Sequence, residues 1–178
     1  MKKLGIIITI ILMLCLLSAC GHSPTKDINT AIFDKDTDKA LELIENADLK
    51  DLDRKSHNDI EELFIQIFDT MDPTDFPIIE STFRGNYKVT KALVDKGVNV
   101  NVIDDFDNST PLIYALQSFS KDKYKIANYL IDHGADITIV DDYGKTALDY
   151  AKEKDILLLD EYPELEQERL TIIERLEE

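Results

Sequence analysis

Two short acidic motifs, each ending in an aromatic residue, are the strongest candidates for recognition chemistry in this 178-residue chain. Both have the order apolar, Asp, Asp, aromatic, and they run Ile103-Asp104-Asp105-Phe106 and Val140-Asp141-Asp142-Tyr143, with 141 − 104 = 37 positions between the first aspartates. A carboxylate beside an aromatic ring suits the capture of a Lys or Arg side chain by ion pairing and cation–π contact. The alternative is structural, because an aspartate at a tight turn bonds its own backbone and the ring then packs on the next hairpin. The motifs therefore predict either contacts to a basic partner or hairpins that support one another.

Patterns that could hold a metal or a cofactor are weaker. The run from Asp34 to Glu45 matches part of a calcium-binding loop, but Lys39 stands where the sharp turn requires Gly. An acid-rich helix start is the simpler explanation, because acids favour the positive end of the helix dipole. The histidines are scattered and make no metal pair at helical spacing, at positions His22, His57 and His133. We therefore expect no metal and no cofactor.

Catalytic arrangements cannot be placed on the sequence. No Ser-His-Asp or Cys-His set is recognisable, the nucleophile-elbow pattern is absent, and six glycines leave little room for a phosphate-binding loop. We expect neither an enzyme nor a small-molecule substrate.

The amino terminus has the features of a segment that is removed from the mature protein. Lys2 and Lys3 precede an apolar run from Leu4 to Leu17, which is too short to span a bilayer. The residues that follow, Leu17-Ser18-Ala19-Cys20-Gly21, resemble the bacterial lipobox. That resemblance implies cleavage before Cys20, a diacylglycerol on its sulfur and usually a further acyl chain on its amino group, which together anchor a protein stably. An ordinary signal peptide with a chance cysteine is the alternative.

We accordingly expect a lipoprotein signal peptide at residues 1–19, a lipidated Cys20 with a short tether at 20–27, and a location on the extracytoplasmic face of a bacterial cell membrane, periplasmic or at the cell surface. Cleavage removes Lys2 and Lys3 but no acid, so 36 acidic residues oppose 20 − 2 = 18 basic ones, a net charge of 18 − 36 = −18. Such a charge disfavours nucleic acid and anionic head groups and favours a basic protein partner. The alternative is that the charge serves solubility alone.

The aspartate motifs lie in a unit that recurs along the chain. The unit opens with Thr110, which can accept the free N–H groups of a helix start, and with Pro111, which fits the first helical position. A second helical run, from Tyr124 to His133, stops at Gly134, where a left-handed residue is wanted. An extended piece follows, and Thr146 begins the pattern again. One such helix pair cannot bury its apolar face alone, so the units must stack.

These residues resemble the ankyrin repeat in the Thr-Pro-Leu opening, the Gly-Ala-Asp after the outer helix and the hairpin from Asp141 to Leu148. The openings are separated by 110 − 76 = 34 and 146 − 110 = 36 residues, against a family period of about 33, and they stand at Phe76, Thr110 and Thr146. The resemblance implies an all-α solenoid of three to four helix-turn-helix repeats joined by short hairpin loops, over residues 28–155. The histidine that the family often has after Thr-Pro-Leu is replaced by Ile79, Ile113 and Asp149.

The repeat pattern is unequal along the chain. The first unit, residues 28–48, is degenerate, and Ala47 stands where the family usually has Gly. Residues 49–75 interrupt the pattern as an insertion or a degraded unit, and we favour an insertion. Residues 156–178 predict capping helices, because the apolar positions of the final run form one stripe among Glu and Arg.

The ankyrin resemblance implies protein binding, because in that family the hairpin tips and inner-helix faces form a concave binding surface and no catalytic activity is shared. The candidate contact residues are those of the two motifs and one inner-helix tyrosine, namely Asp104, Asp105, Phe106, Asp141, Asp142, Tyr143 and Tyr114. We expect a membrane-anchored, extracytoplasmic interaction module for a basic protein, such as an inhibitor or an immunity factor. The alternative is a scaffold of a cell-envelope complex, in which apolar contacts through Tyr114 and Phe119 determine binding. An envelope hydrolase is a remote third possibility that requires a deep pocket gathering a nucleophile and a base.

Overall fold

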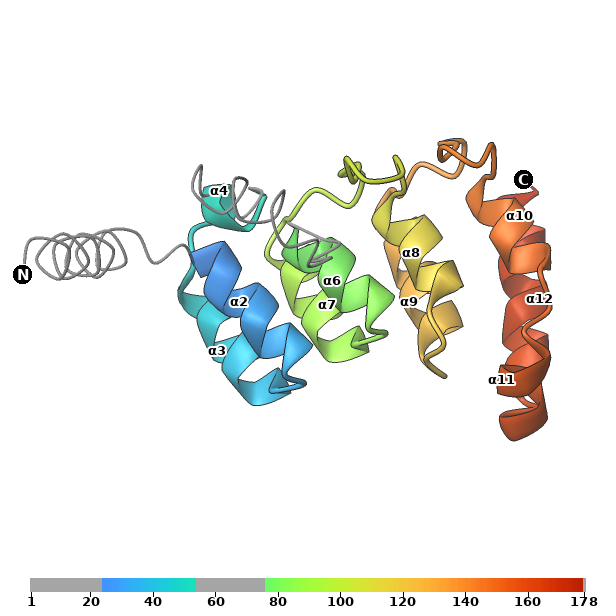
Figure 1. The fold of residues 1–178 in the computed structure, drawn as a ribbon, viewed down its shortest axis with the longest axis horizontal. Helices are drawn as coiled ribbons and strands as arrows, with labels where there is room; N and C mark the ends of the chain where they lie inside the picture. Colours follow the sequence, from blue (N-terminus) through green and yellow to red (C-terminus); the bar gives the residue numbers. More distant parts are fainter. Residues whose placement is uncertain (1–23, 54–75, 178) are drawn as a thin grey trace, which may run out of the picture.

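The computed structural model describes residues 24–53 and 76–177, and this part of the chain consists of helices and loops without a strand (Figure 1). Its helices are, in chain order, α2 (Pro24–Phe33), α3 (Thr37–Asn46), α4 (Leu49–Leu52), α6 (Pro77–Phe83), α7 (Tyr87–Asp95), α8 (Pro111–Gln117), α9 (Lys123–Asp132), α10 (Ala147–Lys152), α11 (Ile156–Glu161) and α12 (Leu165–Leu176). None of these helices is long and apolar enough to cross a membrane. The predicted signal peptide, Cys20, His22, His57 and residues 54–75 of the interrupted segment lie outside the described residues.

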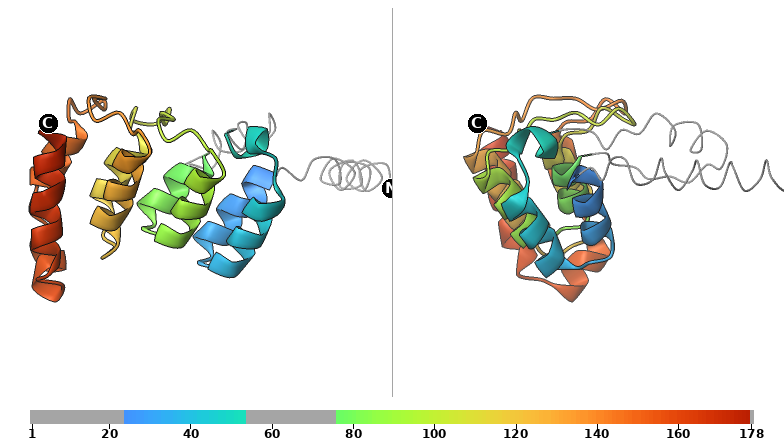
Figure 2. Two further views of the ribbon diagram at one scale, coloured as in Figure 1. Left: turned by 180° about the vertical axis from the view of Figure 1, so that it is seen from behind. Right: turned by 90° about the vertical axis from the view of Figure 1, so that its left-hand side faces the viewer.

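The helices form two columns, and each helix pair contributes one helix to each column (Figures 1 and 2). The inner column consists of α2, α6, α8 and α10, and the outer column consists of α3, α7, α9 and α12, with each helix packed on its neighbours. One apolar core runs between the columns through all four pairs. Because a short pair buries its apolar face only against the next pair, this is the stack that the recurring unit predicts. The predicted all-α repeat solenoid is therefore confirmed.

The inner helices begin as their sequences predict. Thr110 caps α8, its Oγ1 accepts the backbone N–H of Ile113 at 3.3 Å, and Pro111 lies in the first turn. Thr146 caps α10 in a capping box, in which Asp149 Oδ2 accepts the backbone N–H of Thr146 at 2.8 Å. Asp149 stands where the family often has histidine, so in this chain that position stabilises the helix start.

Two outer helices end in different ways. α9 is followed by Gly134 with φ +85°, the left-handed conformation expected at that place. α3 instead ends at Ala47, whose backbone is extended (φ −81°, ψ 149°). The ammonium of Lys96, at the end of α7, donates hydrogen bonds to the carbonyl of Ile44 and, at 2.8 Å, to that of Glu45. A cation from the neighbouring repeat thereby adds to the hydrogen bond that the Ala47 N–H donates to the Ile44 carbonyl, and it satisfies the carbonyl of Glu45.

The last unit differs because α11 is inserted between α10 and α12. α12 packs on α9 and α10 as a cap, and its buried apolar residues are Leu165, Ile172 and Leu176. Arg169 is buried as well, which the apolar pattern did not predict. Its guanidinium donates to the carbonyl of Ala151 at 3.2 Å and to the Glu166 carboxylate at 2.9 and 3.0 Å. The hydrogen bond from Arg169 lowers the pKa of Glu166 to about 2, so this ion pair persists in mild acid.

Candidate protein-interaction surface on the hairpins

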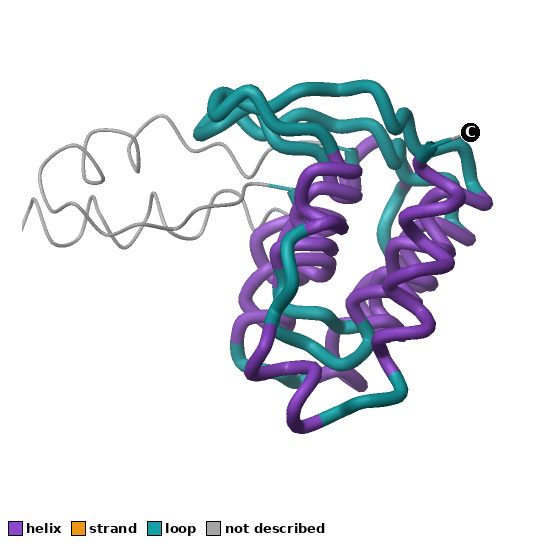
Figure 3. The backbone as a smooth tube through the Cα atoms, turned by 90° about the vertical axis from the view of Figure 1, so that its right-hand side faces the viewer, coloured by secondary structure: helices purple, strands orange, loops and turns teal. Residues whose placement is uncertain are grey.

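Two hairpins lie along one edge of the stack and project beyond the inner helices (Figures 2 and 3). The first hairpin, residues 98–109, joins α7 to α8, and the second, residues 135–145, joins α9 to α10. Burial alternates along the start of the first hairpin, where the core residues are Val98, Val100 and Val102. Between them, the side-chain amide of Asn101 donates to the carbonyl of Gly134 at 2.9 Å and accepts the N–H of Asp136 at 2.8 Å. The bases of the two hairpins are thus joined, and the aspartate motifs lie farther out.

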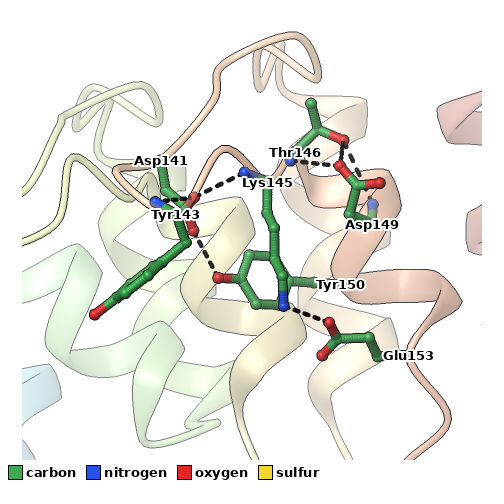
Figure 4. A network of polar contacts seen from close by, with 7 residues as sticks. All are labelled: Asp141, Tyr143, Lys145, Thr146, Asp149, Tyr150 and Glu153. Atoms are coloured by element: carbon green, nitrogen blue, oxygen red, sulfur yellow. Dashed lines mark hydrogen bonds and ion pairs between the residues drawn. The ribbon is translucent and has the colours of Figure 1, made fainter.

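Asp141 stabilises the second hairpin from inside (Figure 4). The residue is 5% exposed, and its Oδ1 accepts the backbone N–H groups of Tyr143 and Lys145, both at 2.9 Å. Its Oδ2 accepts the phenol O–H of Tyr150 at 2.6 Å. Burial, and then the hydrogen bond to Asp141, raises the pKa of Tyr150 to about 12, so this phenol remains a donor at neutral pH. Since Tyr150 belongs to α10, one carboxylate joins the hairpin turn to an inner helix.

Asp104 has the corresponding place in the first hairpin. The residue is 4% exposed, and its Oδ2 accepts the phenol O–H of Tyr114 at 2.6 Å. The same phenol oxygen lies 3.2 Å from Oδ1 of Asp107, which accepts the backbone N–H of Ser109 at 3.0 Å. Burial raises the pKa of Tyr114, and the hydrogen bond to Asp104 raises it further. Tyr114 and Tyr150 each follow a threonine cap by four residues, so the aspartate–tyrosine pair recurs from repeat to repeat.

Three of the predicted partner-binding residues therefore face the interior. Asp104, Asp141 and Tyr114 are 4%, 5% and 5% exposed, and their polar atoms bond within the chain. This geometry corrects the expectation that they present themselves to a partner and agrees with the structural alternative for the motifs. The physical reason is that buried turn amides and a buried phenol need acceptors, and a carboxylate has enough lone pairs to serve several.

The other motif residues lie on the surface of the hairpins. Phe106 and Tyr143 are 63% and 67% exposed, and Asp105 and Asp142 are exposed beside them. Partner contact by these four residues stays a prediction. Two further apolar side chains, Ile103 and Val140, extend the exposed surface.

Two hydrogen bonds join the hairpins close to these exposed rings. The side-chain amide of Asn108 donates to Asp142 Oδ1 at 2.6 Å, and the backbone N–H of Asp142 donates to the carbonyl of Asp107 at 2.9 Å. Asp142 therefore has a structural contact as well as an exposed carboxylate. The two hairpins are thus joined here as well as at their bases.

Several supporting residues were not predicted from the sequence. Lys145 Nζ pairs with Glu153 at 2.5 Å and lies 5.0 Å from the centre of the Tyr150 ring (Figure 4). Asn108 has no counterpart that would mark it as a contact between hairpins. For Tyr150 a signal existed, because the spacing from Thr146 to Tyr150 repeats the spacing from the earlier cap to its tyrosine.

The calcium-like pattern and His133 have local roles. Asp36 is the N-cap of α3, and its Oδ1 accepts the N–H of Lys39 at 3.0 Å, as the simpler explanation of that acidic run expected. Nδ1 of His133 lies 2.7 Å from the carbonyl oxygen of Tyr129, and the two rings are 4.2 Å apart between centroids. Within residues 24–53 and 76–177, no group of three or more His, Cys, Asp or Glu side chains is placed to hold a metal ion.

A shallow groove of about 410 Å³ lies on the outer face, between α7, α9 and α12. Tyr87 and Tyr129 line it, and Nζ of Lys125 lies 3.8 Å from the centre of the Tyr87 ring. The lining contains no Ser, Cys or His side chain. Its other polar lining residues are Asn128, Asp132, Glu168 and Thr171.

Comparison with known proteins agrees with this architecture. The family model described as ankyrin repeats in three copies matches residues 28–141 and 78–162. The chain therefore belongs to the ankyrin-repeat family, whose members are protein-interaction modules. Among solved structures, the crystal structure of the ankyrin repeat domain of Bcl-3, a unique member of the IκB protein family, is similar with a TM-score of 0.51 and 17% sequence identity. The similarity covers 75% of this chain and 49% of that one, so it concerns the fold alone, and this chain spans about half the length of that structure. No curated protein matches the chain.

Proposed function

We propose that this protein is a membrane-tethered, extracytoplasmic binding module that captures a basic protein on its two hairpins. The observation that supports this function is a pair of exposed aromatic rings, Phe106 and Tyr143, each next to an exposed aspartate. Their hairpins are joined to the inner helices and to each other, so little conformational freedom is lost when a partner binds. Aromatic anchors on a preorganised surface are typical of residues that dominate binding energy.

Charge indicates the kind of partner. The whole chain carries a net charge of −16, and the two hairpins contribute exposed carboxylates at Asp105, Asp136 and Asp142. An acidic surface accelerates association with a basic partner and disfavours acidic competitors. A module of this kind inhibits its partner when it covers basic residues that the partner needs elsewhere, as an immunity factor does with a toxin.

Tethering is supported by the lipobox-like residues before Cys20, and it has a direct test. Replacing Cys20 with Ala is expected to abolish incorporation of a clickable palmitate analogue, because the cysteine at the lipobox position, whose sulfur would accept the diacylglycerol, is then absent. Cys15→Ala is the matched control, since Cys15 lies inside the apolar run, and it should leave labelling unchanged. Full labelling of the Cys20→Ala protein would rule out the anchor.

The binding surface is tested by placing a photo-crosslinking amino acid at Phe106 or Tyr143 in the native cell. Both positions are expected to yield the same crosslinked protein, whereas Leu170, exposed on α12, is expected not to. With that protein purified, the double variant Phe106→Ser/Tyr143→Ser should bind it about 30-fold more weakly, the loss that corresponds to about 2 kcal/mol at an interface hot spot. Unchanged affinity would exclude the hairpins as the binding surface.

The scaffold alternative has one observation in its favour, the 84% exposure of Phe119 in the loop between α8 and α9. Salt separates the two functions. Capture of the crosslinked partner should weaken as ionic strength rises if carboxylates attract it, whereas binding that ignores salt and is lost in Phe119→Ser would favour an apolar scaffold contact.

A further inference from the structure

Exposed apolar side chains are concentrated along two opposite edges of the helical stack, the edge that carries the hairpins and the edge where the inner helices end. In the part of the chain that the structure describes, eleven large apolar residues are exposed. Four lie on the hairpins, namely Ile103, Phe106, Val140 and Tyr143. Five lie at or beyond the C-terminal ends of the inner helices, namely Phe33, Phe83, Phe119, Ile156 and Leu157. Of these, Phe83 packs edge-on against Tyr114, with 5.8 Å between the ring centroids. Single exposed apolar residues are ordinary, but three at the ends of successive inner helices, with two more on the inserted α11, form a pattern that needs an explanation.

This second edge of the stack, here named the distal edge, consists of the turns after α2, α6 and α8 and of the segment that contains α11 (Figure 1). Its residues are 33–38, 83–86, 118–122 and 153–161. The most exposed apolar side chains on it are Phe119 at 84% and Leu157 at 83%, values above those of Phe106 and Tyr143 on the hairpins. The insertion of α11 in the last unit thus adds exposed apolar area instead of removing it.

Contacts between consecutive turns hold part of the distal edge together. The guanidinium carbon of Arg84 lies 4.5 Å from the centre of the Phe33 ring, so the first turn contacts the second. The hydroxyl of Ser120 donates to the carbonyl of Gly85 at 3.2 Å, so the second turn contacts the third. Phe33, Phe83 and Phe119 are therefore carried by turns that touch one another.

Acidic residues outnumber basic ones on the distal edge, most clearly in residues 153–161. The distal edge contains eight acids against four bases, a net charge of 4 − 8 = −4. The acids are Asp34, Asp36, Asp38, Asp122, Glu153, Asp155, Asp160 and Glu161, and the bases are Lys35, Arg84, Lys121 and Lys154. An occupant of this surface has to be apolar at its centre and basic at its margins.

We propose that the distal edge is a second protein-binding surface and that it takes a basic amphipathic helix of a partner protein. A helix places apolar side chains on one face and Lys or Arg on the flanks, which matches apolar residues within an acidic margin. The described residues contain no strand, so no sheet edge is available there to pair with an extended peptide. The surface is separate from the hairpin tips, and its occupation does not require them.

A designed peptide tests the inference. The probe is an amphipathic helix of about 18 residues, long enough to fold, built from Leu and Lys with one Trp on its apolar face. The full chain contains no Trp, so the fluorescence reports the peptide alone. Saturable binding is expected, and the distal variant Phe119→Ser/Leu157→Ser should weaken it about tenfold. The control variant Leu49→Ser/Leu170→Ser removes two apolar side chains, each 41% exposed, from other places and should change affinity by less than about twofold.

Further control experiments distinguish binding at the distal edge from binding at the hairpins and from non-specific electrostatic attraction. Phe106→Ser/Tyr143→Ser should leave peptide binding unchanged, so a failure of the hairpin function and a failure of the distal edge are distinguishable. Equal binding of a scrambled peptide with the same composition would overturn the proposal, because attraction by net charge would then suffice. Equal losses in the distal and control variants would overturn it too. Self-association by sedimentation that the distal variant abolishes would assign the edge to a second copy of the chain and also refute the proposal.

Discussion

Replacing Gly85 with Ala is expected to lower the free energy of unfolding by about 3 kcal/mol, the sum of left-handed strain and overpacking. Gly85 has φ +65°, and a Cβ atom there would lie 2.0 Å from Cβ of Ser120 and 2.5 Å from its Oγ. Ser120 belongs to the long loop between α8 and α9 and bonds back to the carbonyl of Gly85 at 3.2 Å. The loop must therefore move if a side chain is added. Urea denaturation of the wild-type and variant proteins measures the loss.

Gly134 provides the matched control for Gly85→Ala. It also has a positive φ, +85°, but a Cβ atom there would meet no other atom within 4 Å. Gly134→Ala should therefore cost only the conformational strain, about 1 kcal/mol. Adding Ser120→Gly to the Gly85→Ala protein should recover part of the loss, since the steric conflict is removed. Equal costs at Gly85 and Gly134 would contradict the close packing of the loop on this turn.

Asp141→Ala is expected to destabilise the protein by about 3 kcal/mol, because three hydrogen bonds disappear and their donors lose a buried acceptor. Those donors are the backbone N–H groups of Tyr143 and Lys145 and the phenol of Tyr150. The protein should remain helical, since the helix core does not include this carboxylate. Denaturation followed by circular dichroism measures both the stability and the helix content.

Asp142→Ala is the control for that prediction. Its carboxylate is exposed and accepts one hydrogen bond, from Asn108, so the expected cost is about 1 kcal/mol. If Asp142→Ala proves as costly as Asp141→Ala, the division between an interior and a surface aspartate is wrong. If Asp141→Ala costs nothing while capture of the partner is lost, Asp141 is a contact residue after all.

The repeat architecture was predictable because its signals are local. A threonine cap, a proline in the first turn and a glycine after the outer helix act within a few residues, so Thr110, Pro111 and Gly134 mark their positions from sequence alone. Features that depend on residues elsewhere in the chain could not be predicted from local sequence. α3 stops where Lys96 supplies the missing cap from a neighbouring unit, and Arg169 enters the interior because it finds both Ala151 and Glu166.

The hairpin site was predictable in position but not in orientation. The sequence placed acids and rings at the tips, yet Asp104 and Asp141 resemble Asp105 and Asp142 in type and differ only in which way they point. That direction is decided by hydrogen-bond donors elsewhere in the chain, above all a tyrosine nine or ten residues later. The motif itself does not include these donors, so its sequence alone cannot predict which aspartate points inward. Repetition of the threonine-to-tyrosine spacing was the one available signal.

The central claim is that buried carboxylates fix the hairpins, so that their exposed rings are presented ready for a partner. Amide hydrogen exchange at Tyr143 and Lys145 in the full-length protein tests it most directly, because both N–H groups donate to Asp141. Exchange about 100-fold slower than in the Asp141→Ala protein is the predicted result. Exchange at the rate of an unstructured peptide in the wild-type chain would contradict the account.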